Sequence, residues 1–258
     1  MIPRILSRLL GQRPPPRISD ATWSATLARL PFLHWLTDTD RQGLKELTER
    51  FLAEKEFSAA GGLALDDTMC LTIAVQGCLP VLRLGLDYYD DWVGIIVYPD
   101  EFVIPRSVID DDGVIHEYDE VASGEAWGGG PLLISWRDVQ MAGEGYNVVI
   151  HEFAHKLDMR NGDADGIPPL NDGLTRKRWE ETLLAAHAAF CDLLDACEDT
   201  GDEPPFDPYA AENPAEFFAV MSEAFFETPG QVLVHYPALY AQFSRFYRID
   251  PMENSTGN

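Results

Sequence analysis

The chain has 258 residues, of which 46% are hydrophobic and 24% are charged, and these proportions are typical of a folded globular protein rather than a disordered one. Its 19 lysines and arginines stand against 43 aspartates and glutamates, so the net charge is -24. Such a surface repels a phosphate backbone. We therefore expect no direct nucleic-acid partner.

The first 17 residues differ in composition from the rest of the chain. They contain four arginines, no acidic residue, and three consecutive prolines at positions 14–16. The apolar stretch within them is too short for a signal peptide or a membrane span. We expect residues 1–17 to form a basic, flexible N-terminal segment and residues 18–258 a single domain. The protein is expected to be cytoplasmic, with no stable membrane association.

The first part of the domain carries helical patterns. Leucine spacing between residues 23 and 53 predicts two short helices, broken near Pro31 and at residues 37–39. A third helix is predicted over residues 66–78, ended by Pro80.

Two β-rich runs follow, within residues 86–98 and over residues 132–136. The acidic stretch between residues 105 and 127 predicts solvated turns or an edge hairpin rather than a metal-binding loop. Helical patterns then dominate, at residues 147–159, 175–197 and 213–226. Segregation of strands before helices predicts an α+β fold with a small mixed or antiparallel sheet and a mostly helical C-terminal half.

The most informative motif is His151-Glu152-Phe153-Ala154-His155. In a helix, residues four apart lie about 40° apart around the axis and about 6 Å apart along it, so both imidazoles can bind one ion. Glu152 can then reach a metal-bound water without being a ligand. In the alternative interpretation, the two histidines are hydrogen-bonded core residues and Glu152 is a surface acid.

A catalytic zinc site needs a third protein ligand and one position left open for water. Position 161 is asparagine, so the histidine that follows the motif in metzincins is absent. Glu216, 61 residues after His155 in the first turn of a predicted helix, is the natural candidate. The same residue could instead complete a capping box with Asn213. Glu223, two turns farther along, is better placed to orient a ligand than to be one.

Longer segments add a family resemblance. His151 to Met159 and Tyr209 to Ala219 resemble the corresponding segments of the Mlc titration factor A family of zinc peptidases, which is similar to the catalytic domain of anthrax lethal factor. Shorter matches occur at residues 86–90, 124–127 and 135–138, and the resemblance covers roughly residues 20–250.

The resemblance implies a zincin-like, gluzincin-type domain that binds one Zn²⁺ through His151, His155 and Glu216. It also implies that Glu152 is the catalytic acid and base and that Tyr209 supports the oxyanion. On its own, Tyr209 would be an ordinary half-buried loop aromatic. The resemblance is poor around Glu223, because the toxin has an acidic residue one turn after its ligand glutamate, where this chain has Val220.

Two functions follow as hypotheses. The first is a zinc metallopeptidase, aminopeptidase-like by resemblance, that aligns its peptide or protein substrate along residues 132–136 as an edge strand; a plain core strand is the alternative there. The second is a regulatory protein that binds and sequesters a transcriptional repressor, because the family is associated with titrating one.

Overall fold

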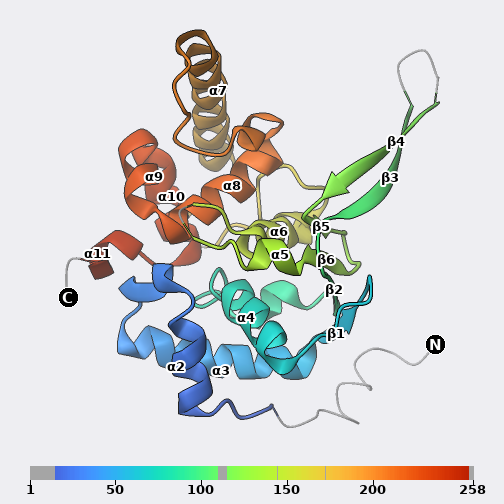
Figure 1. Cartoon of the computed structure of the whole chain (residues 1–258). Helices are drawn as coiled ribbons and strands as arrows, with labels where there is room; N and C mark the ends of the chain where they lie inside the picture. The colour runs from blue at the N-terminus through green and yellow to red at the C-terminus, as the bar shows by residue number, and fades with distance from the viewer. Residues whose placement is uncertain (1–14, 110–114, 144, 172, 256–258) are drawn as a thin grey trace.

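The computed structural model describes residues 15–109, 115–143, 145–171 and 173–255 (Figure 1). Most of the basic segment 1–17 therefore lies outside the described residues, and residues 15–17 are exposed and carry no regular secondary structure. Within the described part of the chain, no helix is both long and apolar enough to cross a bilayer.

Three helices form the N-terminal part of the molecule, and each begins where a side chain can cap it. Ser19, Thr37 and Asp66 accept hydrogen bonds from backbone N–H groups in the first turns that follow them. A short 3₁₀ helix, η1, starts at Pro31, so the predicted break near this proline is confirmed. The helices are α2 (Asp20–Leu27), α3 (Asp38–Glu54) and α4 (Asp67–Cys78).

A four-stranded mixed sheet lies beside these helices, and the predicted α+β class is confirmed. Its strand order is β1-β2-β6-β5, with β1, β2 and β6 parallel and β5 antiparallel to β6. Strand β1 was not predicted, because it is only four residues long and mostly exposed. The run within residues 86–98 supplies a shorter strand than its length suggested, because it begins with a 3₁₀ turn, η2 (Leu86–Tyr89). The strands are β1 (Glu56–Ala59), β2 (Gly94–Tyr98), β5 (Gly124–Ala126) and β6 (Leu132–Ser135).

Of the two alternatives for residues 132–136, the edge strand is wrong and the core strand is confirmed. Strand β6 lies between β2 and β5, and all four of its residues are buried, as its continuous apolar sequence requires. The edge strands are instead β1 and β5, and the one beside β6 is β5, a three-residue strand without the alternating pattern that would have identified it.

The acidic stretch forms a hairpin, which is one of the two predicted outcomes. Strands β3 (Phe102–Ile109) and β4 (Ile115–Ala122) pair antiparallel and project from the body of the molecule (Figure 1). Arg106 on β3 holds the hairpin against β5. Its Nη1 and Nη2 donate to the two carboxylate oxygens of Glu125 at 3.0 and 2.7 Å, and its Nε donates to Glu120 at 2.6 Å.

The C-terminal half is helical, as predicted, and its core is aromatic. Helix α8 lies in the interior, where Pro214 and Glu216 are its only residues that are not fully buried. Helix α6 packs Phe153 against the rings of Tyr89, Trp92 and Phe51 at centroid distances of 5.2, 5.6 and 5.7 Å. The helices are α5 (Trp136–Val139), α6 (Val148–Asp158), α7 (Arg176–Thr200), α8 (Pro214–Glu227), α9 (Pro229–His235), α10 (Pro237–Tyr247) and α11 (Pro251–Ser255).

Helices α4 and α6 approach closely because position 77 has no side chain. A Cβ placed on Gly77 would lie 2.3 Å from the Phe153 ring, whereas a Cβ on Gly43 in α3 would make an ordinary 3.6 Å contact with Leu82. Gly77→Ala should therefore destabilise the protein by about 1–3 kcal/mol through overpacking. Gly43→Ala should stabilise it by about 0.5–1 kcal/mol because glycine disfavours a helix interior. Urea unfolding of both variants measures the two changes, and equal stabilities would contradict the close packing of α4 on α6.

Candidate metal centre

Helix α6 is fixed at its start by a buried asparagine. The side-chain oxygen of Asn147 accepts a hydrogen bond from the backbone N–H of Ile150 at 2.9 Å, which caps the helix. Its side-chain nitrogen donates to Gln76 on α4 at 2.7 Å and to Glu227 on α8 at 2.8 Å. Asn147 thus connects α4, α6 and α8 and fixes the position of the first turn of α6.

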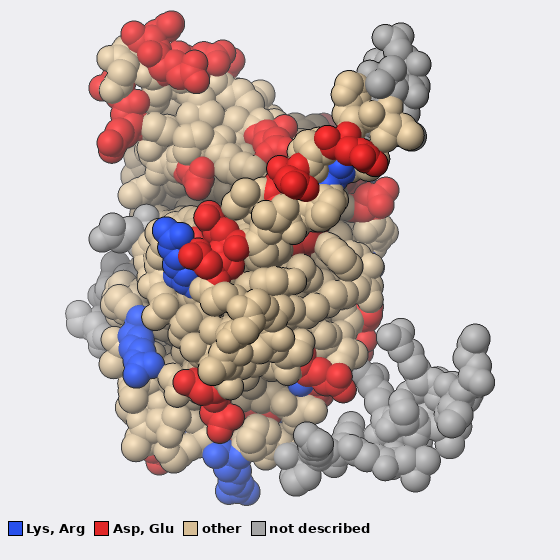
Figure 2. All heavy atoms as spheres, turned by 45° about the vertical axis from the view of Figure 1, so that its right-hand side comes forward, with Lys and Arg blue, Asp and Glu red and all other residues tan. Residues whose placement is uncertain are grey.

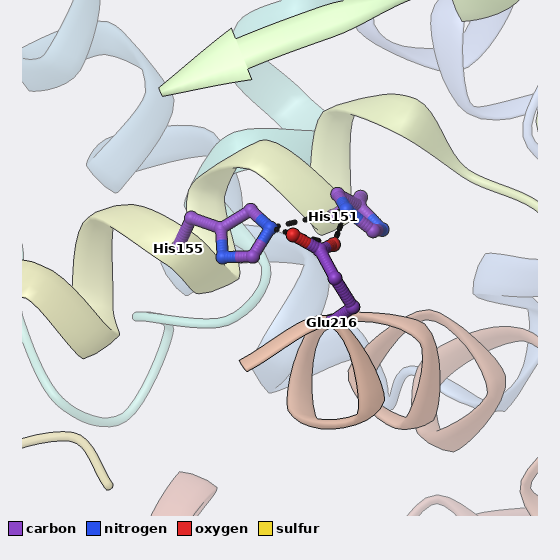
Figure 3. A group of neighbouring side chains, drawn as sticks. All are labelled: His151, His155 and Glu216. Carbon is purple, nitrogen blue, oxygen red and sulfur yellow. Dashed lines mark hydrogen bonds and ion pairs between the residues drawn. The ribbon is translucent and has the colours of Figure 1, made fainter. Parts of the chain in front are cut away.

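The structure brings His151, His155 and Glu216 together (Figure 3). Oε2 of Glu216 lies 3.0 Å from Nε2 of His151 and 3.1 Å from Nε2 of His155, and the two histidine nitrogens are 3.1 Å apart. Among the described residues, these three form the one cluster of histidine, cysteine and acidic side chains able to share a metal ion.

The donor atoms suit a divalent ion such as zinc. With ligands at about 2.0–2.1 Å, a tetrahedral ion separates its donor atoms by about 3.3 Å, close to the three distances found here. Two imidazoles and one carboxylate form a donor set used by catalytic zinc sites. The three side chains also line a cavity of about 510 Å³, so a fourth coordination position would face open space.

The carboxylate of Glu216 turns toward the histidines, although its helix is capped by the neighbouring asparagine. Asn213 accepts hydrogen bonds from the backbone N–H groups of Ala215 and Glu216 at 2.9 and 3.0 Å. The cap is therefore made by the asparagine side chain, and the Glu216 side chain is free to contact the two histidines. Of the two interpretations left open by the sequence, the structure favours the ligand, because the Glu216 carboxylate contacts His151 and His155 and its part of a capping box is not seen among the described hydrogen bonds.

Glu223 lies behind His151, on the side away from Glu216. Its Oε1 is 2.8 Å from Nδ1 of His151, and its Oε2 accepts a hydrogen bond from the backbone N–H of Asn147. A carboxylate that accepts the Nδ1 proton leaves Nε2 free for a metal and fixes the plane of the ring. Glu223 therefore has the contact expected of a residue that orients His151. Val220, the position at which the resemblance to the toxin was poor, lines the cavity.

Burial and hydrogen bonding have opposite effects on the pKa values of His151 and Glu216. Burial lowers the pKa of His151, but its hydrogen bonds with Glu216 and Glu223 outweigh burial and hold this pKa well above its usual value. Burial likewise raises the pKa of Glu216, but its hydrogen bonds with the two histidines reverse this effect and lower the pKa far below its usual range. A divalent cation would take the place of the His151 proton, because only a neutral imidazole nitrogen can bind it.

Glu152 lies beside the cluster and is buried, with 5% of its surface exposed. It also lines the cavity, and burial is the main reason that its pKa is raised to about 7. Of its two carboxylate oxygens, Oε2 has no hydrogen-bond partner in the described part of the chain. The alternative in which Glu152 is an exposed surface acid is therefore wrong.

Tyr209 enters the same cavity from the turn η4 (Pro208–Ala211). Its ring lies 6.1 Å from the His151 ring, measured between centroids, and 44% of the side chain remains exposed. Asp207 caps this turn by accepting the Tyr209 N–H at 2.9 Å. Burial is the main reason that the pKa of Tyr209 is raised, so the phenol keeps its proton at neutral pH.

Several residues that support the centre gave no clear signal in the sequence. Gln76 and Glu227 complete the hydrogen bonds of Asn147, and Glu227 also accepts the Gly145 N–H at 2.9 Å. Asparagine immediately before a helical pattern signals a cap, so Asn147 was identifiable in principle. Its two partners were not, because they are 71 and 80 residues away in the sequence.

Comparison with known proteins agrees with this geometry. The model of the family "Glucose-regulated metallo-peptidase M90" matches residues 7–248. The chain belongs to this family. It is also 42% identical over 241 residues to Mlc titration factor A of Salmonella arizonae, covering 91% of this chain and 93% of that protein. The Mlc titration factor A of Cronobacter sakazakii is 41% identical over 235 residues, covering 89% and 86% of the two chains. The family resemblance noted in the sequence is thereby confirmed, and membership of a metallopeptidase family implies a metal cofactor.

If Glu216 is a ligand, its loss should remove metal binding, whereas loss of a nearby acid should not. Glu216→Gln should weaken zinc binding by at least about 100-fold, since replacing even a residue that only orients a ligand costs about 10–100-fold. Glu212→Gln removes the same charge just before the helix and should bind zinc like the wild type. Competition with a chromogenic chelator gives both affinities, and full zinc affinity in Glu216→Gln would exclude the proposed ligand.

Proposed function

We propose that this protein is a zinc-dependent metallopeptidase with one Zn²⁺ per chain, bound by His151, His155 and Glu216. The observation that carries the proposal is that three donor atoms within 3.1 Å of one another lie beside the buried carboxylate of Glu152 on the wall of one cavity. A metal site with a free position and an adjacent buried base is the arrangement needed to hydrolyse an amide.

The residues of the chain divide the reaction between them. When bound, a zinc ion supplies Lewis acidity, which makes a coordinated water more acidic and polarises a carbonyl group. Glu152 takes the proton from the attacking water and delivers it to the nitrogen of the leaving amine. Burial raises the pKa of Glu152 above the usual range of a glutamate, which suits a carboxyl group that must first accept and then release a proton.

Tyr209 and strand β5 have complementary roles in this proposal. A neutral phenol at the cavity wall can donate a hydrogen bond to the oxyanion that develops on the scissile carbonyl. Strand β5 has a free edge and lines the cavity through Gly124, Glu125 and Ala126, so an extended peptide can pair with its backbone.

Aminopeptidase-like action is the specificity that we propose. Away from His151, His155 and Glu216, the described residues that line the cavity include three acidic side chains, Glu120, Glu125 and Asp207, and one basic side chain, Arg106. The resulting negative charge favours a free amino terminus. Acidic side chains also gather at the projecting end of α7 and beside the hairpin (Figure 2), which favours a peptide or protein partner over a nucleic acid.

We also propose that residues 18–258 fold as one domain and that the protein works in the cytoplasm. One hydrophobic cluster of buried residues extends from Trp23 to Ile249, which supports a single domain. The four cysteines are free thiols, as is usual in a reducing compartment.

The catalytic roles can be tested with matched substitutions. Glu152→Gln should lower kcat for peptide hydrolysis by about 10²–10⁴-fold while zinc remains bound, because the proton acceptor is lost but no ligand is. Tyr209→Phe should lower kcat by about 10²-fold. Tyr146→Phe is the control, because this second cavity phenol donates to Asp138 at 3.2 Å instead. The same substrates with blocked amino termini test the exopeptidase preference, and a Glu152→Gln protein as active as the wild type would refute the mechanism.

A regulatory role is a second candidate, and the name shared by the relatives supports it. Mlc titration factor A is named for titrating the repressor Mlc, and we propose that this chain binds a transcriptional repressor of that kind, with peptidase activity secondary.

Binding and catalysis can be separated by pull-down with the purified repressor. If recognition uses a surface away from the metal centre, Glu152→Gln and His151→Ala should retain the repressor as well as the wild type does. Repressor binding by the wild type that disappears in both variants would place recognition in the cavity itself, and no binding by the wild type would contradict the regulatory role.

A further inference from the structure

Gly124 opens the segment 124–127, which the family resemblance includes without giving it a role. It is the first residue of the edge strand β5, and it lines the cavity together with Glu152. We propose that Gly124 is a positioning residue for the general base: because it has no side chain, the backbone of β5 can lie directly against the Glu152 carboxyl group. This inference rests on the proposed peptidase function.

With Glu152 in its present position, the contact leaves no room for a side chain at position 124. A Cβ at position 124 would lie 2.4 Å from Oε1, 2.6 Å from Cγ and 2.7 Å from Cδ of Glu152. Carbon atoms in contact are normally about 3.5–4.0 Å apart, so even alanine would overlap three atoms of the carboxylate arm. Gly124 is not among the glycines with positive φ. Space next to Glu152, rather than backbone conformation, therefore requires glycine here.

Strand β5 cannot retreat to make room, because it is held on both sides. The backbone N–H of Ser135 on β6 donates to Ser123 at 2.7 Å, and Arg106 binds both carboxylate oxygens of Glu125. Lys156, on the same helix as Glu152, donates to the carbonyl groups of Trp127 and Gly130 at 2.7 and 2.9 Å. These bonds fix the distance between β5 and α6.

The Glu152 side chain is the part that must yield to an added Cβ. Its carboxyl group is the end of a flexible side chain, and its Oε2 has no hydrogen-bond partner among the described residues that would restrain it. A methyl group on residue 124 therefore displaces the carboxylate within the cavity and leaves the fold intact. Misplacing a catalytic group by about 1 Å can lower a rate by about 100-fold.

The test compares Gly124→Ala with Gly128→Ala in full-length protein loaded with zinc. An added Cβ at position 128 would make one ordinary contact, 3.7 Å from Sδ of Met159. Gly124→Ala should lower kcat by about 10–100-fold with KM, zinc affinity and urea midpoint unchanged. Gly128→Ala should match the wild type in all four. In a Glu152→Gln background, Gly124→Ala should cause no further loss, because it acts through that carboxylate.

A crystal structure of metal-free Gly124→Ala gives a readout independent of activity. The proposal expects the Glu152 carboxylate to be displaced while β5 and the three ligand side chains keep their places. An unmoved carboxylate, or a shifted strand, would overturn it. If Gly124→Ala does not fold, Glu152→Asp decides: this shorter side chain should let Gly124→Ala fold with no further loss of activity, and failure to do so would also overturn the proposal.

Different results would refute the proposed peptidase function and the positioning role of Gly124. Wild-type protein that binds zinc but cleaves no peptide would refute the proposed function, and with it any catalytic role for Gly124. Active wild-type protein with an equally active Gly124→Ala variant would refute the positioning role alone.

Discussion

The packing of α8 against α6 is the constraint on which the candidate site depends. Helix α6 supplies two histidines one turn apart, but a metal site needs a third ligand from elsewhere. Glu216 and Glu223 are seven residues apart on α8, so they lie on nearly the same face, about two turns from each other. One contacts the Nε2 edge of His151 and the other its Nδ1 edge. A rotation of α8 would remove the proposed ligand and the residue proposed to orient His151 together.

Burying these carboxyl groups is costly, and hydrogen-bond donors from neighbouring residues offset the cost. Glu223 and Glu227 lie one turn apart near the start of α6, and burial raises the pKa of both, that of Glu227 to about 7. Their hydrogen bonds come from the backbone and side chain of Asn147, the backbone of Gly145 and the ring of His151. This hydrogen-bond network contacts His151 and connects helices α4, α6 and α8. A single asparagine therefore caps α6, binds Glu227 and holds Glu223 at the correct distance from the ligand.

The sequence predicted the parts of this site that depend on local geometry. The helical repeat places His151 and His155 on one face, and caps such as Asn213 mark where helices begin. It could not decide whether Glu216 faces inward, because one glutamate at that position suits both a cap and a ligand. Nor could it decide between an edge strand and a core strand for residues 132–136. Strand β6 has the longer apolar run and was therefore the more visible strand, whereas β5 is identified by pairing with β6 and by contacts with Arg106 and Glu152, which are distant in the sequence.

The correction at the sheet edge changes how the catalytic parts are connected. With β5 at the edge, the surface proposed to align the peptide also touches the carboxyl group proposed to move its protons. Lys156, next to His155 on α6, donates hydrogen bonds to the turn that follows β5 and so links α6 to this strand. The proposed substrate alignment, base position and metal ligation therefore share one frame, in which a displacement of β5 relative to α6 would disturb all three at once.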